Sequence, residues 1–508
     1  MKKSALLALA LPWLLVGCEH LADDFPQLAP IDLSTFGLAA DPSEIEAASA
    51  KEAAESPVEE VEAYGMKAWL VEDSSLPLVS VQLMFEGAGS SSDPEDRRGR
   101  ALFAAALLDE GAGDLNALAF QKALDEKAIQ MSFRTNDDVL VVQIRSLSEH
   151  LPEAFRLLGL ALTDARFDRK DIERKRKLAL SQLNASQTRP GFVLAKRFGE
   201  LAFDGHPYGA PPLGDEKALK RMAKSDLENY VTQTLTKERL FIAATGDVTA
   251  ATLEQLMANH LKDLPDASLL PAPAKTSIKG QGRLEVVKLS TPQSSILLST
   301  QAVDRKDERF FAAFVLNHIV GGDTLTSVLG TAIREKKGLA YSVNSYLDPM
   351  SHASSFNVRF STRNEGVSTA YETLSAELIN IAQNGVTEAQ YKQAMDYITG
   401  SFVLSLDNNS NYTRFLNTMQ RFDLGKDYLQ TRNDKIRAVT IEQVNALAKD
   451  MFDPSRWLVV IVGEPEKLQS GNTNVKTAAA EKPKQETEES PAQHPTKHPA
   501  QQPAIIIK

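Results

Sequence analysis

Between residues 58 and 264, short apolar runs alternate with longer segments in which apolar residues recur with a helical period. The short runs predict buried strands, and the longer segments predict helices with one face turned to a core. Strands are expected at residues 78–85, 139–145 and 240–244, and helices at residues 99–108 and 171–183. Such a mixture indicates an α+β domain, with helices packed on a mostly antiparallel sheet.

The same alternation returns at residues 283–468. The intervening residues 265–282 have no regular apolar period and contain three prolines and two glycines, which predicts a domain linker. Residues 19–57, rich in Pro, Ala and Glu, are predicted to be a tether. Residues 469–508 are polar and contain five prolines, so we expect a disordered tail that buries too little apolar area to fold.

Two pairs of similar segments indicate that the chain contains a duplication. Arg239 precedes the run Leu-Phe-Ile-Ala-Ala-Thr, and Arg456 precedes the run Trp-Leu-Val-Val-Ile-Val, an offset of 456 minus 239, or 217 residues. The helix entries at residues 167–172 and 386–391 are 219 residues apart. Nearly equal offsets at separate places predict two homologous domains.

Composition narrows the class of protein. The chain has 508 residues, of which 43% are hydrophobic and 24% charged, typical of a soluble globular protein of about two to four domains. Its 67 acidic and 56 basic residues give a net charge of −11, without a long basic tract, which argues against nucleic acid as a partner. The single cysteine excludes an internal disulfide and a cysteine-rich zinc site.

That cysteine, Cys18, ends a segment typical of an export signal. Lys2 and Lys3 precede an apolar run at residues 5–16 that is short for a membrane span. The following Leu-Val-Gly-Cys ending resembles the lipobox of bacterial lipoproteins, in which the thiol is acylated; the alternative is an ordinary cleaved signal with an incidental cysteine. The resemblance implies a lipid-anchored, periplasm-facing protein of the cell envelope. Because Glu19 follows the cysteine rather than Asp, the outer membrane is favoured over the inner membrane.

The most specific motif is the segment 321–343, Gly-Gly-Asp-Thr-Leu-Thr-Ser-Val-Leu-Gly-Thr-Ala-Ile-Arg-Glu-Lys-Lys-Gly-Leu-Ala-Tyr-Ser-Val. It resembles the signature of the second domain in the insulinase/pitrilysin family of zinc peptidases, which includes the mitochondrial processing peptidases. The resemblance covers residues 58–468 and implies that Arg334 and Tyr341 bind substrate and stabilise the transition state near a zinc ion. Gly338 is expected to turn the backbone between them. The alternative is a helix end with ordinary surface charges, followed by a strand.

The same family carries its zinc ligands in the first domain, as His-x-x-Glu-His on a helix and a more distant Glu. The corresponding helix of this chain places Leu102, Ala105 and Ala106 at the three motif positions, and Lys175 at the distant position. A slip in the alignment leaves Glu173 as an alternative to Lys175. The resemblance therefore implies a degenerate zinc site and no metal bound by this chain.

These features lead to two functional hypotheses and a third alternative. The first is a non-catalytic subunit of a heteromeric zinc metalloprotease, inactive alone, whose partner subunit holds the zinc and cleaves extended peptides in the cell envelope. Peptide would add to a sheet edge, for which residues 129–135 are the candidate. The second is a peptide-binding or scaffolding envelope lipoprotein without a protease partner. The third alternative is an enzyme that acts alone by unfamiliar chemistry.

Overall fold

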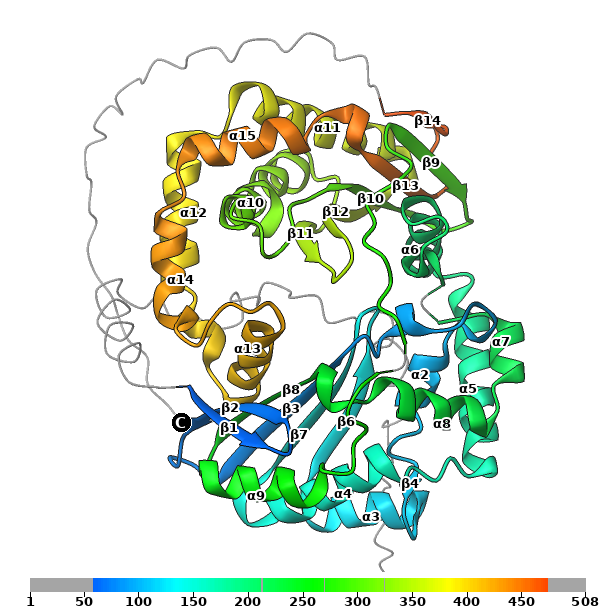
Figure 1. Ribbon diagram of the computed structural model, residues 1–508. Helices are drawn as coiled ribbons and strands as arrows, with labels where there is room; N and C mark the ends of the chain where they lie inside the picture. Colours follow the sequence, from blue (N-terminus) through cyan, green and yellow to red (C-terminus); the bar gives the residue numbers. More distant parts are fainter. Residues whose placement is uncertain (1–57, 212, 269, 324, 474–508) are drawn as a thin grey trace, which may run out of the picture. The chain divides into compact units, whose positions relative to one another are not determined.

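The computed structural model describes residues 58–473 apart from residues 212, 269 and 324. The predicted signal, the tether and Cys18 therefore lie outside the described residues, as does most of the predicted tail. Figure 1 shows the order of the elements along the chain. Among the described residues, no helix is long and apolar enough to cross a bilayer.

Two six-stranded sheets form the framework of the protein. The first has the order β1-β2-β8-β3-β7-β6, with strands β1 (Glu59–Ala63), β2 (Met66–Glu72), β3 (Leu78–Glu86), β6 (Gln130–Thr135), β7 (Val139–Leu147) and β8 (Leu240–Gly246). The second has the order β11-β12-β10-β13-β9-β14, with strands β9 (Arg283–Lys288), β10 (Gln293–Gln301), β11 (Val343–Pro349), β12 (Ser354–Arg363), β13 (Leu458–Gly463) and β14 (Gly471–Asn472). A small hairpin joins β4 (Gly111–Ala112) and β5 (Leu115–Asn116).

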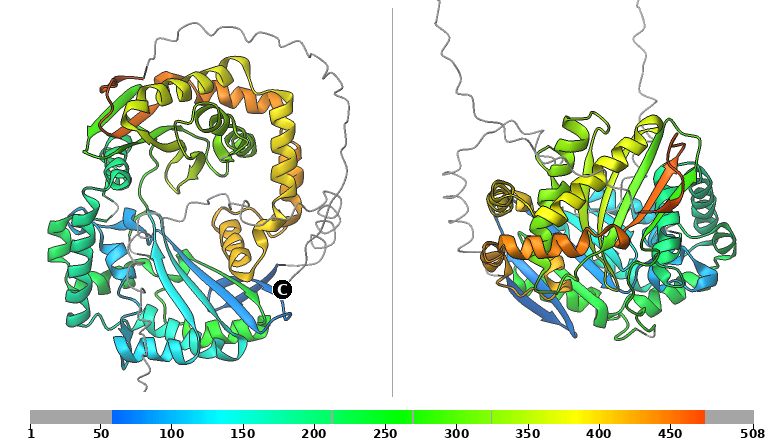
Figure 2. Two further views of the ribbon diagram at one scale, coloured as in Figure 1. Left: turned by 180° about the vertical axis from the view of Figure 1, so that it is seen from behind. Right: turned by 90° about the horizontal axis from the view of Figure 1, so that it is seen from above.

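Helices cover both sheets (Figures 1 and 2). Those between the first and last strands of the first sheet are α2 (Arg100–Ala105), α3 (Ala117–Glu126), α4 (Leu151–Thr163), α5 (Arg169–Ser186), α6 (Pro190–Ala202), α7 (Glu216–Arg221) and α8 (Lys224–Thr234), and α9 (Ala250–His260) follows β8. The later helices are α10 (Phe310–Asn317), α11 (Val367–Asn384), α12 (Glu388–Gly400), α13 (Asn409–Arg421), α14 (Tyr428–Arg437) and α15 (Ile441–Met451).

The strands β8 and β13 form because their side chains are mostly apolar on both faces. All six residues of β13 are buried, as are six of the seven residues of β8. Such runs cannot face water without a large free-energy cost, so they occupy the middle of the sheet and are covered on both sides. The large core of the first half joins this sheet to α4 and α9, with Phe85 and Phe155 fully buried.

The strand order confirms the duplication and the α+β class. Reading the second sheet backwards gives β14-β9-β13-β10-β12-β11, which pairs strand by strand with β1-β2-β8-β3-β7-β6. In both sheets one strand pair is parallel, β2 with β8 and β9 with β13, and the other main pairs are antiparallel. In chain order β2, β3, β6, β7 and β8 correspond to β9, β10, β11, β12 and β13, whereas β1 is the first strand of its half and β14 the last of its half. The shared connectivity of five strands indicates one ancestral unit repeated.

Two helices 219 residues apart, α6 and α13, each pack on the sheet of the other half. Leu194 and Ala202 of α6 share a buried cluster with Val460 of β13. Reciprocally, Leu416 and Met419 of α13 share a cluster with Ala243 of β8. Figure 1 shows α13 on the first sheet and α6 beside β10 and β13. The linker at residues 265–282 thus separates the two repeats in sequence, whereas the packing crosses between them.

Some element ends differ from the sequence prediction. The helix expected at residues 99–108 ends at Ala105, and the helix expected at residues 171–183 extends from Arg169 to Ser186. The predicted tail begins too early, because Gly471–Asn472 pairs with β9 and Thr473 is buried, with its hydroxyl donating to the Pro454 carbonyl at 2.6 Å. Residues 471–473 make two backbone pairings and bury one threonine, and such contacts produce no periodic apolar pattern in the sequence. The start of the tail was therefore predicted too early.

Candidate functional site

The helix α2 and its C-cap residue, Ala106, hold the three positions at which the family resemblance places zinc-binding residues. It begins after Gly99, whose φ of +92° is left-handed, and it packs against α8 and β6. Ala105 is buried, while Leu102 and Ala106 are half-buried. None of these alkyl side chains has a lone pair to offer a metal ion, so the residues present do not fit a zinc site.

The fourth position, Lys175 on α5, carries a cation that is already paired. Its Nζ lies 2.8 Å from Glu110 Oε1, and its side chain is only 20% exposed. The neighbouring Arg174 pairs with the other oxygen of Glu110 and lies 3.1 Å from Asp171. Glu110, four residues after Ala106, is therefore neutralised by two cations, which makes it a poor metal ligand.

The basic run at residues 174–177 is not simply a solvated helix face. Arg176 is mostly buried and donates to two backbone carbonyls near the end of α7, those of Leu219 and Met222, the latter at 2.7 Å. Its guanidinium also lies 5.9 Å from the centre of the Phe103 ring on α2. Arg176 therefore fixes α5 against α2 and α7. The sequence concealed this role because its targets are backbone carbonyls.

Zinc analysis checks this description. Since Leu102, Ala105, Ala106 and Lys175 supply no ligand, and no group of three or more metal-binding side chains occurs within the described part of the chain, the isolated protein is expected to hold no stoichiometric zinc. Elemental analysis of protein purified without chelators, before and after dialysis against zinc, measures the content. One tightly held ion for each chain would contradict the assignment of α2.

Arg334 and Tyr341 flank a short exposed segment before the edge strand β11. Arg334 is half-buried in the π-helical turns of Gly330–Glu335. Gly338 has a φ of +60°, and its N–H donates to the Arg334 carbonyl at 3.0 Å, so the predicted turn at this glycine is confirmed. Tyr341 is 91% exposed. The phenol is therefore free to reach a group outside its own chain.

The predicted peptide-binding edge lies at one end of the first sheet. β6 is the last strand in the order, and it pairs with β7 alone, in the register Gln130↔Arg145 to Thr135↔Leu140. An edge strand leaves every second N–H and C=O without a partner in the sheet. The candidate segment at residues 129–135 is therefore an edge strand, as the sequence predicted. A bound peptide at this edge stays a proposal.

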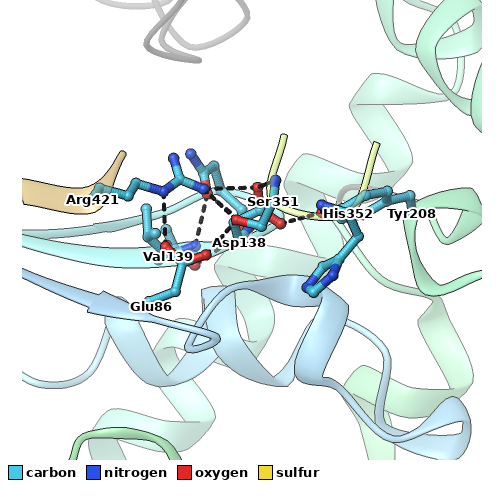
Figure 3. Close-up of polar contacts among 9 residues, drawn as sticks. Glu86, Asp138, Val139, Tyr208, Ser351, His352 and Arg421 are labelled. Atoms are coloured by element: carbon cyan, nitrogen blue, oxygen red, sulfur yellow. Dashed lines mark hydrogen bonds and ion pairs between the residues drawn. The ribbon is translucent and has the colours of Figure 1, made fainter. Parts of the chain in front are cut away.

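A polar network between the two halves was not predicted from sequence (Figure 3). Arg421, the last residue of α13, donates through Nε to Glu86 Oε2 at 2.8 Å and through Nη2 to Asp138 Oδ2 at 3.0 Å. The same Nη2 lies 2.7 Å from Ser351 Oγ, and the Ser351 N–H donates to Asp138 at 2.8 Å. Tyr208 donates to the other Asp138 oxygen and accepts the N–H of His352 at 3.1 Å.

The charges of this network depend on one another. Although burial opposes its charge, Glu86 and Asp138 hold the pKa of Arg421 above its ordinary value. Burial, with the charges of Asp137 and Asp138, raises the pKa of the nearby Asp348 to about 6. The network joins residues more than 300 positions apart, so no local pattern could reveal it. Its partners are saturated with hydrogen bonds, which suits a structural link between the halves rather than acid–base chemistry.

The comparisons with known proteins agree with this geometry. The model of the insulinase family, peptidase family M16, matches residues 68–216, and the model described as the peptidase M16 inactive domain matches residues 221–397. An uncharacterized zinc protease of Streptomyces coelicolor is 26% identical over 73% of this chain and 82% of its own length. A Helicobacter pylori protein named non-peptidase homolog YmxG is 23% identical over 78% of this chain and 91% of its own length.

Solved structures share the fold. The crystal structure of a peptidase M16 inactive domain from Pseudomonas fluorescens has a TM-score of 0.76 at 24% identity, covering 81% of this chain and 98% of that chain. The crystal structure of a protease from Helicobacter pylori has a TM-score of 0.73 at 16% identity, covering 80% and 100%. The protein is thus a peptidase-type fold of two repeated α+β domains. The chain belongs to the insulinase family, peptidase family M16.

Proposed function

We propose that this protein is a non-catalytic subunit of a heteromeric zinc metalloprotease, to which it contributes Arg334 and Tyr341. The observation that carries the proposal is the contrast between its two half-sites. Leu102, Ala105 and Ala106 offer a metal nothing to bind, whereas Tyr341 is 91% exposed and no packing on its own chain requires it. A phenol and a guanidinium are suited to hold a substrate carbonyl and a developing oxyanion.

The zinc ion would belong to a partner subunit of the same family, which would also supply the general base. Family members work as paired domains or subunits, which supports such a partnership. The substrate would be an extended peptide that pairs with β6, since this edge offers free backbone groups. This chain's task would then be to bind and orient the peptide, while the partner cleaves it.

Mixing experiments test the proposal. The chain is co-expressed with a partner that has an intact His-x-x-Glu-His motif, such as one encoded beside it, and the complex is purified from envelope extract through a tag on this chain. Peptidase activity is expected in the mixture and in neither subunit alone, and a chelator should abolish it. If no such partner co-purifies and mixing adds no activity, a peptide-binding or scaffolding envelope lipoprotein becomes the better assignment.

The proposed location is the periplasmic side of the outer membrane, through a lipid on Cys18, a residue outside the described part of the chain. Cys18→Ser is expected to move the protein from the membrane pellet to the soluble fraction, because a single apolar signal without an acyl chain holds a protein weakly. Fractionation followed by immunoblotting measures the shift. Persistent membrane association of the variant would contradict the lipobox interpretation.

A further inference from the structure

The uncovered face of the first sheet next to β6 carries exposed arginines. In an antiparallel pair, residues directly opposite each other point to the same face. Gln130 lies opposite Arg145, Ser132 opposite Gln143, and Arg134 opposite Val141. Arg134 and Arg145 therefore share one polar face, and both are exposed.

The helix α13 covers the neighbouring part of this same face. Gln143 donates to Ser80 Oγ at 2.9 Å, and Ser80 Oγ lies 3.3 Å from Ser410 Oγ on α13. Since α13 contacts β3 and β8, the strands β7 and β6 extend beyond it. The arginines of these two strands thus lie beside α13 on its side of the sheet.

A third exposed arginine, Arg414, lies on α13, the helix next to this region. It follows Ser410 by four residues and precedes Arg421 by seven, a spacing that puts all three on one stripe of the helix. Ser410 and Arg421 contact Ser80 and Asp138, whereas Gln420, on the opposite flank of this stripe, donates to the Ile242 carbonyl of β8 at 2.8 Å. The stripe with Arg414 therefore faces the β7 side.

These three arginines have no ion pair with any carboxylate in the described part of the chain, although acids lie close by in the sequence. Arg421 already pairs with Glu86 and Asp138, and the half-buried Asp137 accepts a hydrogen bond from Ser90 at 2.7 Å. Three free guanidinium groups thus remain on one face of a chain whose net charge is −11. Guanidinium groups bind carboxylates more strongly than neutral acceptors.

We propose that Arg134, Arg145 and Arg414, together the arginine face, select acidic segments of the peptide that adds as a strand to β6. The inference rests on the proposed function and names its substrate class. Arg134 would contact the peptide side chain directly opposite it on the added strand. Arg145, which lies opposite Gln130 on β7, would contact the peptide side chain opposite Gln130, a β6 residue four positions from Arg134. At about 3.3 Å for each residue, these positions are about 13 Å apart. Acidic residues four positions apart in the peptide would therefore meet both.

Peptide binding to the detergent-solubilised full-length chain tests the proposal. Two labelled peptides of a strand-forming sequence differ only in having Glu or Gln at every fourth position, and fluorescence anisotropy measures both affinities. The Glu peptide is expected to bind about tenfold more tightly at low ionic strength, with a difference that shrinks as salt is added. A third peptide, the Glu sequence with N-methylated backbone groups, should bind weakly because it cannot pair with β6.

Two matched triple variants distinguish the effect of the arginine face on peptide preference from the effect of net charge. The triple variant Arg134→Gln, Arg145→Gln and Arg414→Gln is expected to bind both peptides equally. The control variant Arg169→Gln, Lys217→Gln and Arg221→Gln removes the same charge from exposed positions on α5 and α7 and should keep the preference. An equal loss in both variants would assign the preference to net charge and overturn the proposal.

The outcomes distinguish this inference from the proposed function. If the two peptides bind the native protein equally well and the N-methylated peptide does not, the arginine face is not selective, but strand addition to β6 stands. If none of the peptides binds, both the inference and the peptide-binding part of the proposed function are wrong. The activity of the mixed complex is measured separately, so Arg334 and Tyr341 can keep their role in either case.

Discussion

In the proposed complex with a zinc-bearing partner subunit, Arg334→Ala or Tyr341→Phe is expected to lower peptide turnover by roughly tenfold to a thousandfold, the range for loss of one transition-state donor. The effect should fall on kcat more than on KM, because these groups would bind the developing charge rather than the resting substrate. Steady-state kinetics of the complex measures both constants. Arg334→Lys tests whether the forked geometry of the guanidinium is needed in addition to its charge.

Folding and assembly should not change in these variants. Tyr341 is 91% exposed, so its substitution is expected to alter the free energy of unfolding by less than about 0.5 kcal/mol. Lys336→Ala, an exposed cation in the same segment, and Tyr64→Phe, an exposed tyrosine on the first half, are the matched controls and should retain full turnover. Unchanged turnover of both the Arg334 and Tyr341 variants would refute their assigned role.

Asp93→Ala is expected to destabilise the protein by about 3 kcal/mol, since removing one partner of a buried charge pair leaves the other unpaired. The Asp93 side chain is fully buried and accepts the N–H groups of Gly99 and Ala101, each at 2.9 Å. Arg100 Nε lies 3.8 Å away, buried and without a hydrogen bond in the described structure. The substitution would thus leave two N–H groups at the start of α2 without their acceptor, and Arg100 without the carboxylate beside it.

Chemical denaturation at a fixed pH measures this loss, and Asp93→Asn is the milder companion variant because an amide oxygen can still accept one of the N–H groups. The asparagine variant should fall between the wild type and the alanine variant. Equal stability of the alanine variant and the wild type would show that Asp93 does not hold the start of α2.

The pH dependence of stability gives a second readout on Asp93. Burial raises the pKa of its carboxyl from 3.8 to about 7, against the lowering effect of its hydrogen bonds and Arg100. The folded state therefore holds the proton more tightly than the unfolded chain. The resulting contribution to stability is complete below about pH 4 and is lost as the pH rises to about 7. Asp93→Asn should lack this slope in denaturation curves measured across that range.

Three strands, the internal repeat and one left-handed turn were predicted from the sequence. The mostly apolar runs at β3, β7 and β8 identified three strands of the first sheet to within two residues, because a strand that packs on the core needs apolar side chains on at least one face. The offset between the two runs after Arg239 and Arg456 identified the repeat. The motif at Gly338 identified a left-handed turn, since few other residues adopt that backbone conformation.

Side-chain contacts between residues that are distant in the chain could not be predicted from the sequence. Arg421 looks like an ordinary end of an amphipathic helix, yet its guanidinium joins Glu86 and Asp138 from the other half. Arg176 belongs to a run that resembles a solvated face, yet it binds the carbonyls that end α7. Neither role depends on a neighbour in sequence, so no spacing rule could indicate it.

The sequence by itself determined the repeated α+β fold, the alkyl side chains at the metal positions of α2, and the presence of Arg334 and Tyr341, because these depend on residue chemistry and local period. Only the tertiary structure decided that α6 and α13 pack on the sheets of opposite halves, that Glu110 is neutralised by Arg174 and Lys175, and that Arg134 and Arg145 share one exposed face of β6 and β7. Those arrangements depend on contacts between distant segments, which form only when burial of the two sheets brings the segments together.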